Sequence, residues 1–369
     1  MATSALPSPV AVPSVPSRYF INAPVDTLFV GGASLLFYLL IVYVQGGART
    51  PVIYETAAAL AWVVNWPHFS ATAFRLYGAR ANLKQYPITA TLSPIIVTAL
   101  VACCFAFPQT VAPNFVKLFF YWSSYHFSGQ TIGISLLYAR RGQHKVSPWE
   151  RFGLQGWVYG TFLLSTIRSE TSTGERDYYG IKYAGLGLPD ELVKASAVFM
   201  WGCCALWALL ILIQVFRDRK PPPLLYLIPS VAQFVWFVPG GLVPGFSEFV
   251  PFFHSLQYIV IAWAMQLKER ADRSETAVDV PFLARESALW YAINLAGGAT
   301  MFWALPHLAK AAGVQEGLAM GVVIAGVQIH HFFVDGVIWK LRAQAVVSPL
   351  LANIPQLLRR PAVPQGALT

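Results

Sequence analysis

Long apolar stretches separated by short polar segments dominate the chain. Between residues 27 and 334, ten stretches of sixteen or more residues contain no Asp, Glu, Lys or Arg. They span residues 27–48, 56–74, 85–116, 118–139, 152–167, 195–216, 221–247, 249–267, 287–309 and 317–334. A helix needs about 20 residues to cross the hydrocarbon of a bilayer, and none of the stretches alternates with the period of two that a barrel strand requires. The pattern therefore predicts an all-α integral membrane protein, a polytopic bundle of about ten transmembrane helices.

The composition supports this class and excludes others. Only 12% of the 369 residues are charged and 56% are hydrophobic, whereas soluble domains carry about 25% charged residues. A soluble, disordered or coiled-coil protein is therefore excluded, and the lipid bilayer is the expected surroundings. The net charge of +9 does not indicate a nucleic-acid partner, because the basic residues separate apolar stretches instead of forming one patch.

The basic residues instead predict an orientation. If both termini share one side, the connections on that side carry 19 of the 26 Lys and Arg residues, and the opposite side carries 7. Because cytoplasmic connections of membrane proteins are enriched in Lys and Arg, we expect both termini in the cytoplasm. The setting we expect is a bacterial inner membrane. The longest connection on the opposite side, residues 169–194, is expected to form a small ordered cap.

The chain is expected to form one membrane domain with short tails. Residues 1–20 are predicted to be a disordered Pro/Ser-rich tail, residues 21–345 the polytopic membrane domain, and residues 346–369 a cytoplasmic tail. The four cysteines form two adjacent pairs inside apolar stretches, at 103–104 and 203–204. This spacing matches no common metal-ligand motif, so the cysteines are expected to be small packing residues.

The positions of the histidines are the most informative feature for function. Five of the seven lie well inside apolar stretches: His68, His126, His254, His330 and His331. His307 lies at the end of a stretch, after Pro306, and His144 lies in a connection. Ionisable side chains inside a membrane are costly and by default indicate function. Counting back from the next basic residue places all five at roughly 10 to 21 Å from the cytoplasmic ends of their helices. We therefore expect the histidines to converge in one layer, with Asp335 close to them.

A cluster of this kind predicts a metal centre. Imidazole suits iron, zinc and copper, and several histidines with one carboxylate are compatible with non-haem iron. The expected ligands are His68, His126 and His254, together with His330 or His331. Asp335 is the candidate catalytic residue, either as a ligand or as a group that orients one. Polar residues one helical turn from the histidines are expected to hydrogen-bond their rings: Asn65, Ser123, Gln130, Gln257, Tyr258 and Gln328.

Other functions use the same residues. Paired histidines could hold haem b in an electron-transfer or assembly protein, and three ligands with an activated water would suffice for a zinc-dependent lipid hydrolase. A transporter is also possible, although the histidine-bearing stretches do not fall at the equivalent positions that a parallel repeat would give. Each histidine could also simply satisfy a polar contact between helices. The sequence leaves the oligomeric state open.

Two histidine-containing segments carry a resemblance. The chain lacks the H-x-x-x-H and H-x-x-H-H boxes of membrane fatty-acid hydroxylases and desaturases. YHFSGQ (125–130) and FFHSLQY (252–258) resemble segments of the Brp/Blh family of membrane carotene dioxygenases, although that family's H-G-x-x-D segment has no counterpart here. The resemblance implies iron held by histidines, with His126 and His254 at matching positions, and oxygen-dependent cleavage of a long polyene. The expected function is thus a membrane-embedded non-haem iron oxygenase acting on a lipophilic small molecule, a lipid or an isoprenoid.

Overall fold

The computed structural model describes residues 17–44, 51–274, 276–339, 350 and 352–358. Within them the chain is mainly helical, which confirms the all-α prediction. Five helices in this part of the chain are long and apolar enough to cross a membrane: Ala23–Tyr43, Pro87–Ala106, Asp190–Asp218, Leu224–Leu242 and Glu316–Ile338. These helices are compatible with a multi-pass membrane protein.

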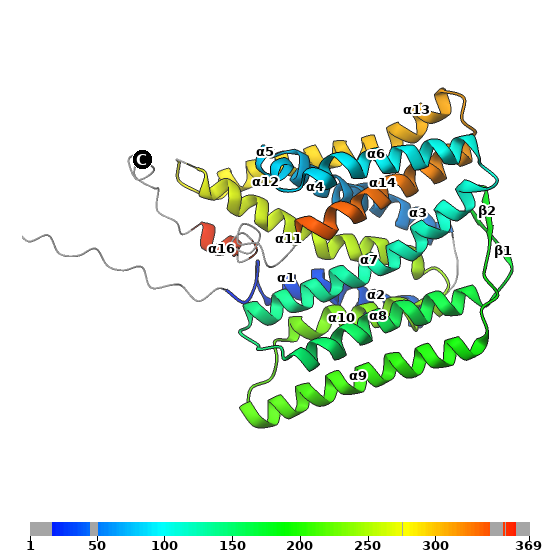
Figure 1. Ribbon diagram of the computed structural model, residues 1–369. Helices are drawn as coiled ribbons and strands as arrows, with labels where there is room; N and C mark the ends of the chain where they lie inside the picture. The colour runs from blue at the N-terminus through cyan, green and yellow to red at the C-terminus, as the bar shows by residue number, and fades with distance from the viewer. Residues whose placement is uncertain (1–16, 45–50, 275, 340–349, 351, 359–369) are drawn as a thin grey trace, which may run out of the picture.

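The helices follow the apolar stretches of the sequence (Figure 1). The first half contains α1 (Ala23–Thr27), η1 (Leu28–Gly32), α2 (Ala33–Val44), α3 (Pro51–Leu60), η2 (Ala61–Asn65), α4 (Trp66–Tyr77), α5 (Arg80–Gln85), α6 (Pro87–Ala106), α7 (Val111–Arg141) and α8 (Pro148–Glu170). The second half contains β1 (Glu175–Tyr178), β2 (Ile181–Ala184), α9 (Asp190–Asp218), α10 (Leu224–Phe237), η3 (Gly240–Leu242), η4 (Ser247–Phe249), α11 (Val250–Asp272), α12 (Val280–Ala299), η5 (Thr300–Ala304), α13 (Leu305–Ala311), α14 (Glu316–Ile338) and α16 (Ile354–Leu357).

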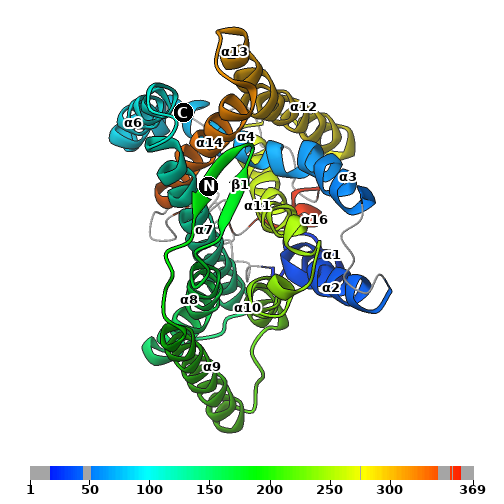
Figure 2. The ribbon, with the colours of Figure 1, turned by 90° about the vertical axis from the view of Figure 1, so that its right-hand side faces the viewer.

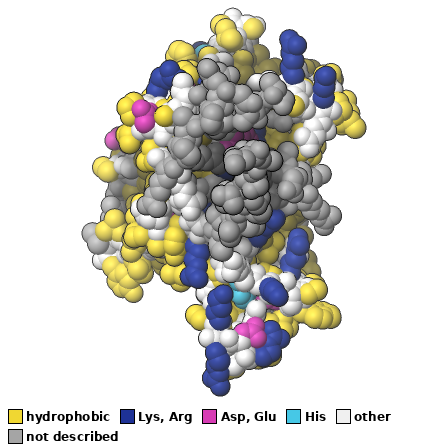
Figure 3. Space-filling model, turned by 90° about the vertical axis from the view of Figure 1, so that its left-hand side faces the viewer, with side chains coloured by type: hydrophobic (Ala, Val, Ile, Leu, Met, Phe, Trp, Pro, Cys, Tyr) yellow, Lys and Arg dark blue, Asp and Glu magenta, His cyan; other side chains and the backbone are white. Residues whose placement is uncertain are grey.

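Successive long helices run in opposite directions along one bundle axis (Figure 1). The described segments nearest the two termini meet at one end of this bundle, where the backbone N–H of Ile354 donates to the carbonyl of Phe20 at 2.8 Å. Figure 3 looks onto this end, which we call the termini end, and shows Lys and Arg side chains around its rim. Basic residues of the described chain therefore gather at the end that both terminal segments share.

The opposite end carries a small β-hairpin between α8 and α9 (Figure 2). Strand β1 pairs antiparallel with β2, with Tyr178 opposite Ile181. The two turn residues, Tyr179 and Gly180, have φ of 54° and 81°, as the tight turns preferred in hairpins require. The ordered cap expected between residues 169 and 194 is thus a hairpin.

Small residues bring α8 and α9 into close contact on one flank of the bundle (Figure 2). A Cβ atom built on Gly160 would lie 2.9 Å from the Cα of Met200, and one on Gly153 would lie 3.1 Å from the Cα of Trp207. A Cβ on Gly156 would collide with the sulfur of Cys203, which is a free, buried thiol. Glycines spaced in this way allow helices to approach closely in membranes, and Cys203 lies in the contact.

A buried cluster of charged and polar groups, which we call the terminal anchor, holds the two terminal segments. It consists of Asp26, Tyr138 and Arg141. The Arg141 side chain is 1% exposed and donates to the carbonyls of Leu350, at 2.7 Å, and Ala352, at 2.9 Å.

The same cluster fixes the start of the described chain. Asp26 accepts hydrogen bonds from the backbone N–H of Phe20, at 2.7 Å, and from the Tyr138 hydroxyl, at 2.8 Å. Phe20 is fully buried beneath the Arg141 guanidinium, which lies 4.0 Å from the ring centroid. Residues 17–20 of the predicted first tail therefore pack on the bundle, as do the described residues of the second; residues 1–16 and 359–369 lie outside the described residues.

Candidate metal centre

Four helices from distant parts of the chain each contribute one histidine to the interior. His68 lies in α4, His126 near the middle of α7, His254 close to the start of α11 and His331 in the second half of α14. The π-helical turn η2 immediately precedes α4. Such a turn inserts one residue and rotates the following face by about 100°, so η2 helps set the direction in which His68 points. π-Helical turns are frequent at functional sites.

The four imidazoles form a compact cluster, which we call the histidine cluster. Each ring offers a nitrogen such that all four nitrogens lie within 4.8 Å of one another. Neighbouring ring centroids are 4.5 Å apart for His68 and His331, 4.9 Å for His331 and His126, 5.0 Å for His126 and His254, and 5.2 Å for His254 and His68. The predicted convergence of these four helices is thus present in the structure.

These separations can be compared with the geometry of one metal ion. Metal–nitrogen bonds of imidazole are about 2.0–2.1 Å long, and the ring centre lies about 1.2 Å beyond the nitrogen. Two imidazoles on one ion then have centroids roughly 4.5 Å apart at a bond angle of 90° and roughly 5.2 Å apart at the tetrahedral angle. The four observed separations fall between these values, so the residues present fit a single ion.

Burial and hydrogen bonding give a second test of the fit. His68, His254 and His331 are at most 2% exposed. Among the described residues, both nitrogens of His68, both nitrogens of His254 and the Nδ1 of His331 have no hydrogen-bond partner. Each unsatisfied buried polar group costs about 1–3 kcal/mol, and native interiors leave few of them. The cluster therefore contains buried imidazole nitrogens without partners, and a bound metal ion would satisfy them.

Asp335 lies against the cluster and is held in place on its far side. Its Oδ2 is 3.3 Å from Nε2 of His331 and 3.7 Å from Nε2 of His126. Its Oδ1 accepts hydrogen bonds from Thr72 Oγ1 at 2.9 Å and from Trp339 Nε1 at 3.0 Å. One carboxylate oxygen is thus fixed by protein groups while the other faces the histidines, as expected for a ligand or an orienting group.

A further hydroxyl extends this network. The Tyr258 hydroxyl lies 2.6 Å from Thr72 Oγ1. Because a threonine hydroxyl has one proton and Thr72 donates it to Asp335, Tyr258 must be the donor in this pair. Tyr258 was expected to bond the ring of His254, but it acts through Thr72 and Asp335 instead. Thr72 and Trp339 were not predicted; each lies one helical turn from a predicted residue, His68 or Asp335.

Three other polar residues expected to support the rings contact different groups. Gln130 donates to the backbone carbonyl of His254 at 2.8 Å, and Gln257 donates to the carbonyl of Val30 at 2.6 Å. Asn65 accepts a hydrogen bond from Ser255 at 2.6 Å. These amides join helices to one another. Spacing along one helix placed Asp335 beside His331. It did not identify the partners of these three amides, because each of them bonds a group on a neighbouring helix.

His330, the fifth predicted ligand, lies outside the cluster and requires a correction. Its Nε2 is 3.0 Å from the Tyr77 hydroxyl, and the two rings stack with centroids 6.0 Å apart. Consecutive helical residues point about 100° apart, so His331 faces the cluster and His330 faces α4 and α6. Of the two histidines outside the apolar layer, His144 lies 2.8 Å from Glu150 Oε1 and His307 contacts the carbonyl of Trp303.

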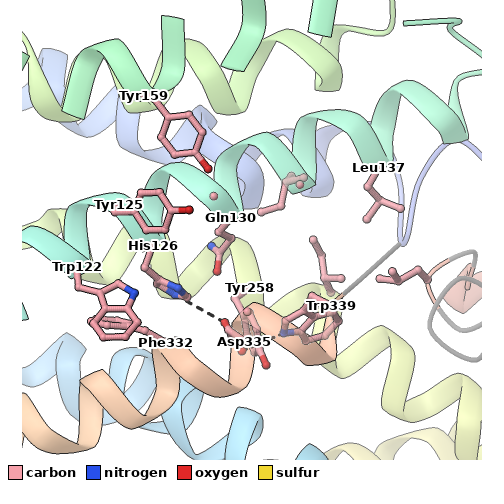
Figure 4. A pocket seen from close by; sticks show the side chains of 16 residues that line it. Trp122, Tyr125, His126, Gln130, Leu137, Tyr159, Tyr258, Phe332, Asp335 and Trp339 are labelled. Atoms are coloured by element: carbon pink, nitrogen blue, oxygen red, sulfur yellow. Dashed lines mark hydrogen bonds and ion pairs between the residues drawn. The ribbon is translucent and has the colours of Figure 1, made fainter. Parts of the chain in front are cut away.

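A cavity of about 320 Å³, which we call the first cavity, opens beside the cluster (Figure 4). His126 and Asp335 form part of its wall. Most other lining residues are aromatic, aliphatic or glycine: Trp122, Tyr125, Gly129, Gly133, Ile134, Leu137, Tyr159, Tyr258, Ile261, Phe332, Gly336, Trp339 and Leu350, with Gln130 adding an amide. No atom lies within 4 Å of a Cβ built on Gly133 or Gly336. Because glycine has no side chain, these two positions leave space for an apolar molecule next to the histidines.

Comparison of the chain with protein-family models, with curated proteins and with solved structures gives no match. The resemblance of YHFSGQ and FFHSLQY to segments of the Brp/Blh family therefore stays a prediction. The class of protein is defined by the fold and the site alone. It is an all-α protein with helices suited to a membrane and a buried four-histidine cluster beside an apolar cavity.

Proposed function

We propose that the chain is a membrane-embedded metalloenzyme, a non-haem iron oxygenase acting on a lipophilic substrate. The observation that carries the proposal is the histidine cluster, whose four nitrogens lie within 4.8 Å of one another and include buried atoms without partners among the described residues. Leaving such groups unpaired in the interior is costly. A bound cation would satisfy them.

The membrane part of the proposal comprises ten crossing segments with both termini in the cytoplasm of a bacterial inner membrane. Supporting it are large apolar side chains on the outside of the bundle, including Val198 (75% exposed), Ile88 (70%) and Phe216 (68%). A bilayer would cover such surfaces. The excess of Lys and Arg at the termini end supports a cytoplasmic location for that end.

The proposed ligands are His68, His126, His254 and His331, with Asp335 as a further ligand or as the group that orients His331. Iron bound there would supply the activation of dioxygen. The surrounding chain has three tasks: α4, α7, α11 and α14 hold the imidazoles, Thr72 and Trp339 hold one oxygen of Asp335, and the apolar interior excludes water. Asp335 Oδ2 is also placed to accept a hydrogen bond from a molecule in the first cavity.

The substrate of this proposal lies in the first cavity. Its volume of about 320 Å³ falls within the range of small-molecule sites, which are typically apolar with a few polar groups. His126 and Asp335 supply polar groups at the cluster side of the cavity. An apolar molecule in the cavity would be in direct contact with the metal-binding wall.

The geometry favours a single ion over haem. Ring centroids separated by 4.5–5.2 Å leave no space for a porphyrin between the four imidazoles. Catalytic zinc sites typically use three protein ligands, whereas this site offers four histidines and a nearby carboxylate. The site therefore offers more ligands than a zinc hydrolase or a solute-binding site requires. This set of ligands suits non-haem iron.

Metal analysis and an absorption spectrum of the purified, detergent-solubilised protein test the proposal. We expect about one iron per chain and no Soret band. A Soret band would indicate haem, and zinc in place of iron would indicate a hydrolase. A metal-free protein that also fails to bind added iron would refute the metal centre.

The adjacent histidines of α14 provide a matched pair of variants. His331→Ala removes a proposed ligand, and we expect its iron content to fall below about a tenth of the wild-type value. His330→Ala removes the same side chain at the neighbouring position, outside the cluster, and should keep its iron. Equal iron content in the two variants would contradict the proposed ligand set.

A further inference from the structure

A second cavity, of about 510 Å³, lies on the other side of α14 from the first. The α14 residues that line it include Val323, Val327 and His330, whereas Phe332 and Gly336 line the first cavity. At about 100° per residue, these two sets occupy opposite faces of the helix. Helix α14 therefore separates two cavities that flank the same histidine cluster.

The second cavity touches the cluster through two side chains. His331 and Phe69 both line it, and their ring centroids are 4.5 Å apart. The Thr72 hydroxyl at this wall already donates to Asp335. A molecule in the second cavity would therefore lie against the outer side of the histidine cluster without replacing any group that holds it.

The remaining walls of the cavity are largely apolar. They come from α4, α6, α14 and the segment of η5 and α13, and include Ala73, Pro94, Val97, Val101, Met301 and Leu305. The outer face of α6 exposes Ile95 (63%) and Leu92 (47%). In the proposed membrane setting this face meets lipid. Leu305 and Tyr77, which line the cavity, are themselves exposed, so the cavity is accessible to a lipophilic molecule from the bilayer.

One polar pair, Tyr77 and His330, gives the cavity a hydrogen-bond acceptor. His330 Nε2 lies 3.0 Å from the Tyr77 hydroxyl, which also lies 3.3 Å from the carbonyl of Ala90. A phenol has one proton and two acceptor lone pairs. If His330 donates to Tyr77, the phenol donates to Ala90 and keeps one lone pair; if Tyr77 donates to His330, it keeps both. In either tautomer the Tyr77 oxygen can accept one more hydrogen bond.

We propose that the second cavity binds a lipophilic alcohol. The hydroxyl of the ligand donates to the Tyr77 oxygen beside His330, and its hydrocarbon body lies between α6 and α14 against Val97, Val101 and Val327. This site gives His330 a binding role distinct from the metal centre. It does not depend on whether the histidine cluster holds an ion.

The test uses the full-length protein in phosphatidylcholine vesicles. The probe is a long-chain primary alcohol with a mid-chain diazirine, and its comparison compound is the methyl ether of the same molecule, which cannot donate a hydrogen bond. After photolysis, labelled residues are identified by mass spectrometry. We expect the alcohol to label residues of α6 and α14 that line the second cavity about threefold to tenfold more than the ether. Equal labelling by the two compounds, or labelling only outside the cavity, would overturn the proposal.

Three variants test whether the difference in labelling arises in the second cavity. Tyr77→Phe should abolish the difference between the alcohol and the ether, and Ala73→Phe, which fills the second cavity, should reduce labelling by both. Gly133→Leu, which fills the first cavity, should leave labelling of the second unchanged. If a variant does not fold, the ratio of alcohol to ether labelling on the wild-type protein still decides. Iron content measured on the same samples reports separately on the metal centre.

Discussion

The terminal anchor and the histidine cluster are both polar groups buried in an apolar bundle, but they differ in how their atoms are paired. In the anchor, both terminal nitrogens of Arg141 donate to carbonyls, and both oxygens of Asp26 accept hydrogen bonds. In the histidine cluster, both nitrogens of His68 and His254 have no partner among the described residues.

This difference separates a structural role from a binding role. A buried polar network whose terminal atoms are paired stabilises one arrangement of the chain. A buried network with unpaired atoms is costly unless something else binds to it. Protein groups therefore pair the anchor except at Arg141 Nε, whereas five buried nitrogens of the histidine cluster have no partner among the described residues, and the proposed ion would satisfy the cluster. Three substitutions test this contrast, beginning with the largest expected effect.

Arg141→Met should destabilise the protein by about 3–5 kcal/mol, because it leaves the carbonyls of Tyr19, Leu350 and Ala352 without their donor, at about 1–3 kcal/mol for each buried unsatisfied group. Denaturant-induced unfolding in detergent measures the loss. The control is Arg140→Met, at the exposed neighbouring position, which should change stability by less than about 0.5 kcal/mol. The folded fraction of Arg141→Met should still bind iron. Equal stability of the two variants would show that the anchor is not structural.

Thr72→Val should act on the histidine cluster and have little effect on the anchor. The substitution keeps the shape of the side chain but removes the hydrogen bond to Asp335 Oδ1 and the acceptor for Tyr258. Changes to such supporting groups lower metal affinity about 10- to 100-fold. Titration of iron against a competing chelator measures this, with Thr300→Val as control, since Thr300 donates only to Ala296 of its own helical segment. Unchanged affinity would mean that Asp335 does not support the site.

Gly133→Leu should have the smallest effect on the protein itself. The new side chain enters open space in the first cavity, so iron content should stay the same and stability should change by about 1 kcal/mol or less. Photolabelling of α7 by a lipophilic probe should fall, because the probe binds less well in the first cavity beside the cluster. Gly202→Leu on α9 is the control, because a Cβ there also meets no atom within 4 Å. Equal labelling in both variants would show that the first cavity is not a binding site.

The sequence was sufficient to predict the all-α class, the positions of most helices and the approach of four histidines. Long uncharged stretches predict helices, and the cost of placing imidazoles inside them indicates a shared site. The choice between His330 and His331 could have been made from Asp335, which lies four residues after His331 and therefore on the same face. The four-residue spacing between His331 and Asp335 was the signal that could have identified His331 as the ligand.

Other features depend on packing between helices that no local pattern encodes. Depths counted along separate helices spread from roughly 10 to 21 Å for residues that meet in space, because tilted helices reach one depth with different numbers of residues. The pairing of Arg141 with the carbonyls of Leu350 and Ala352 joins residues more than 200 positions apart. Basic residues near helix ends predicted orientation, but they did not distinguish this buried arginine from its exposed neighbour Arg140.

The place of Leu350 in the wall of the first cavity has a consequence for biosynthesis. All four helices of the histidine cluster precede Leu350 in the chain, so a ribosome completes them before the residue that finishes the cavity wall. Arg141 of α7 is made early and holds the carbonyl of Leu350 only when that segment arrives. In the proposed metalloenzyme, insertion of the ion can therefore precede closure of the cavity, and a chain that stops before Leu350 would carry the histidines but leave the cavity wall incomplete.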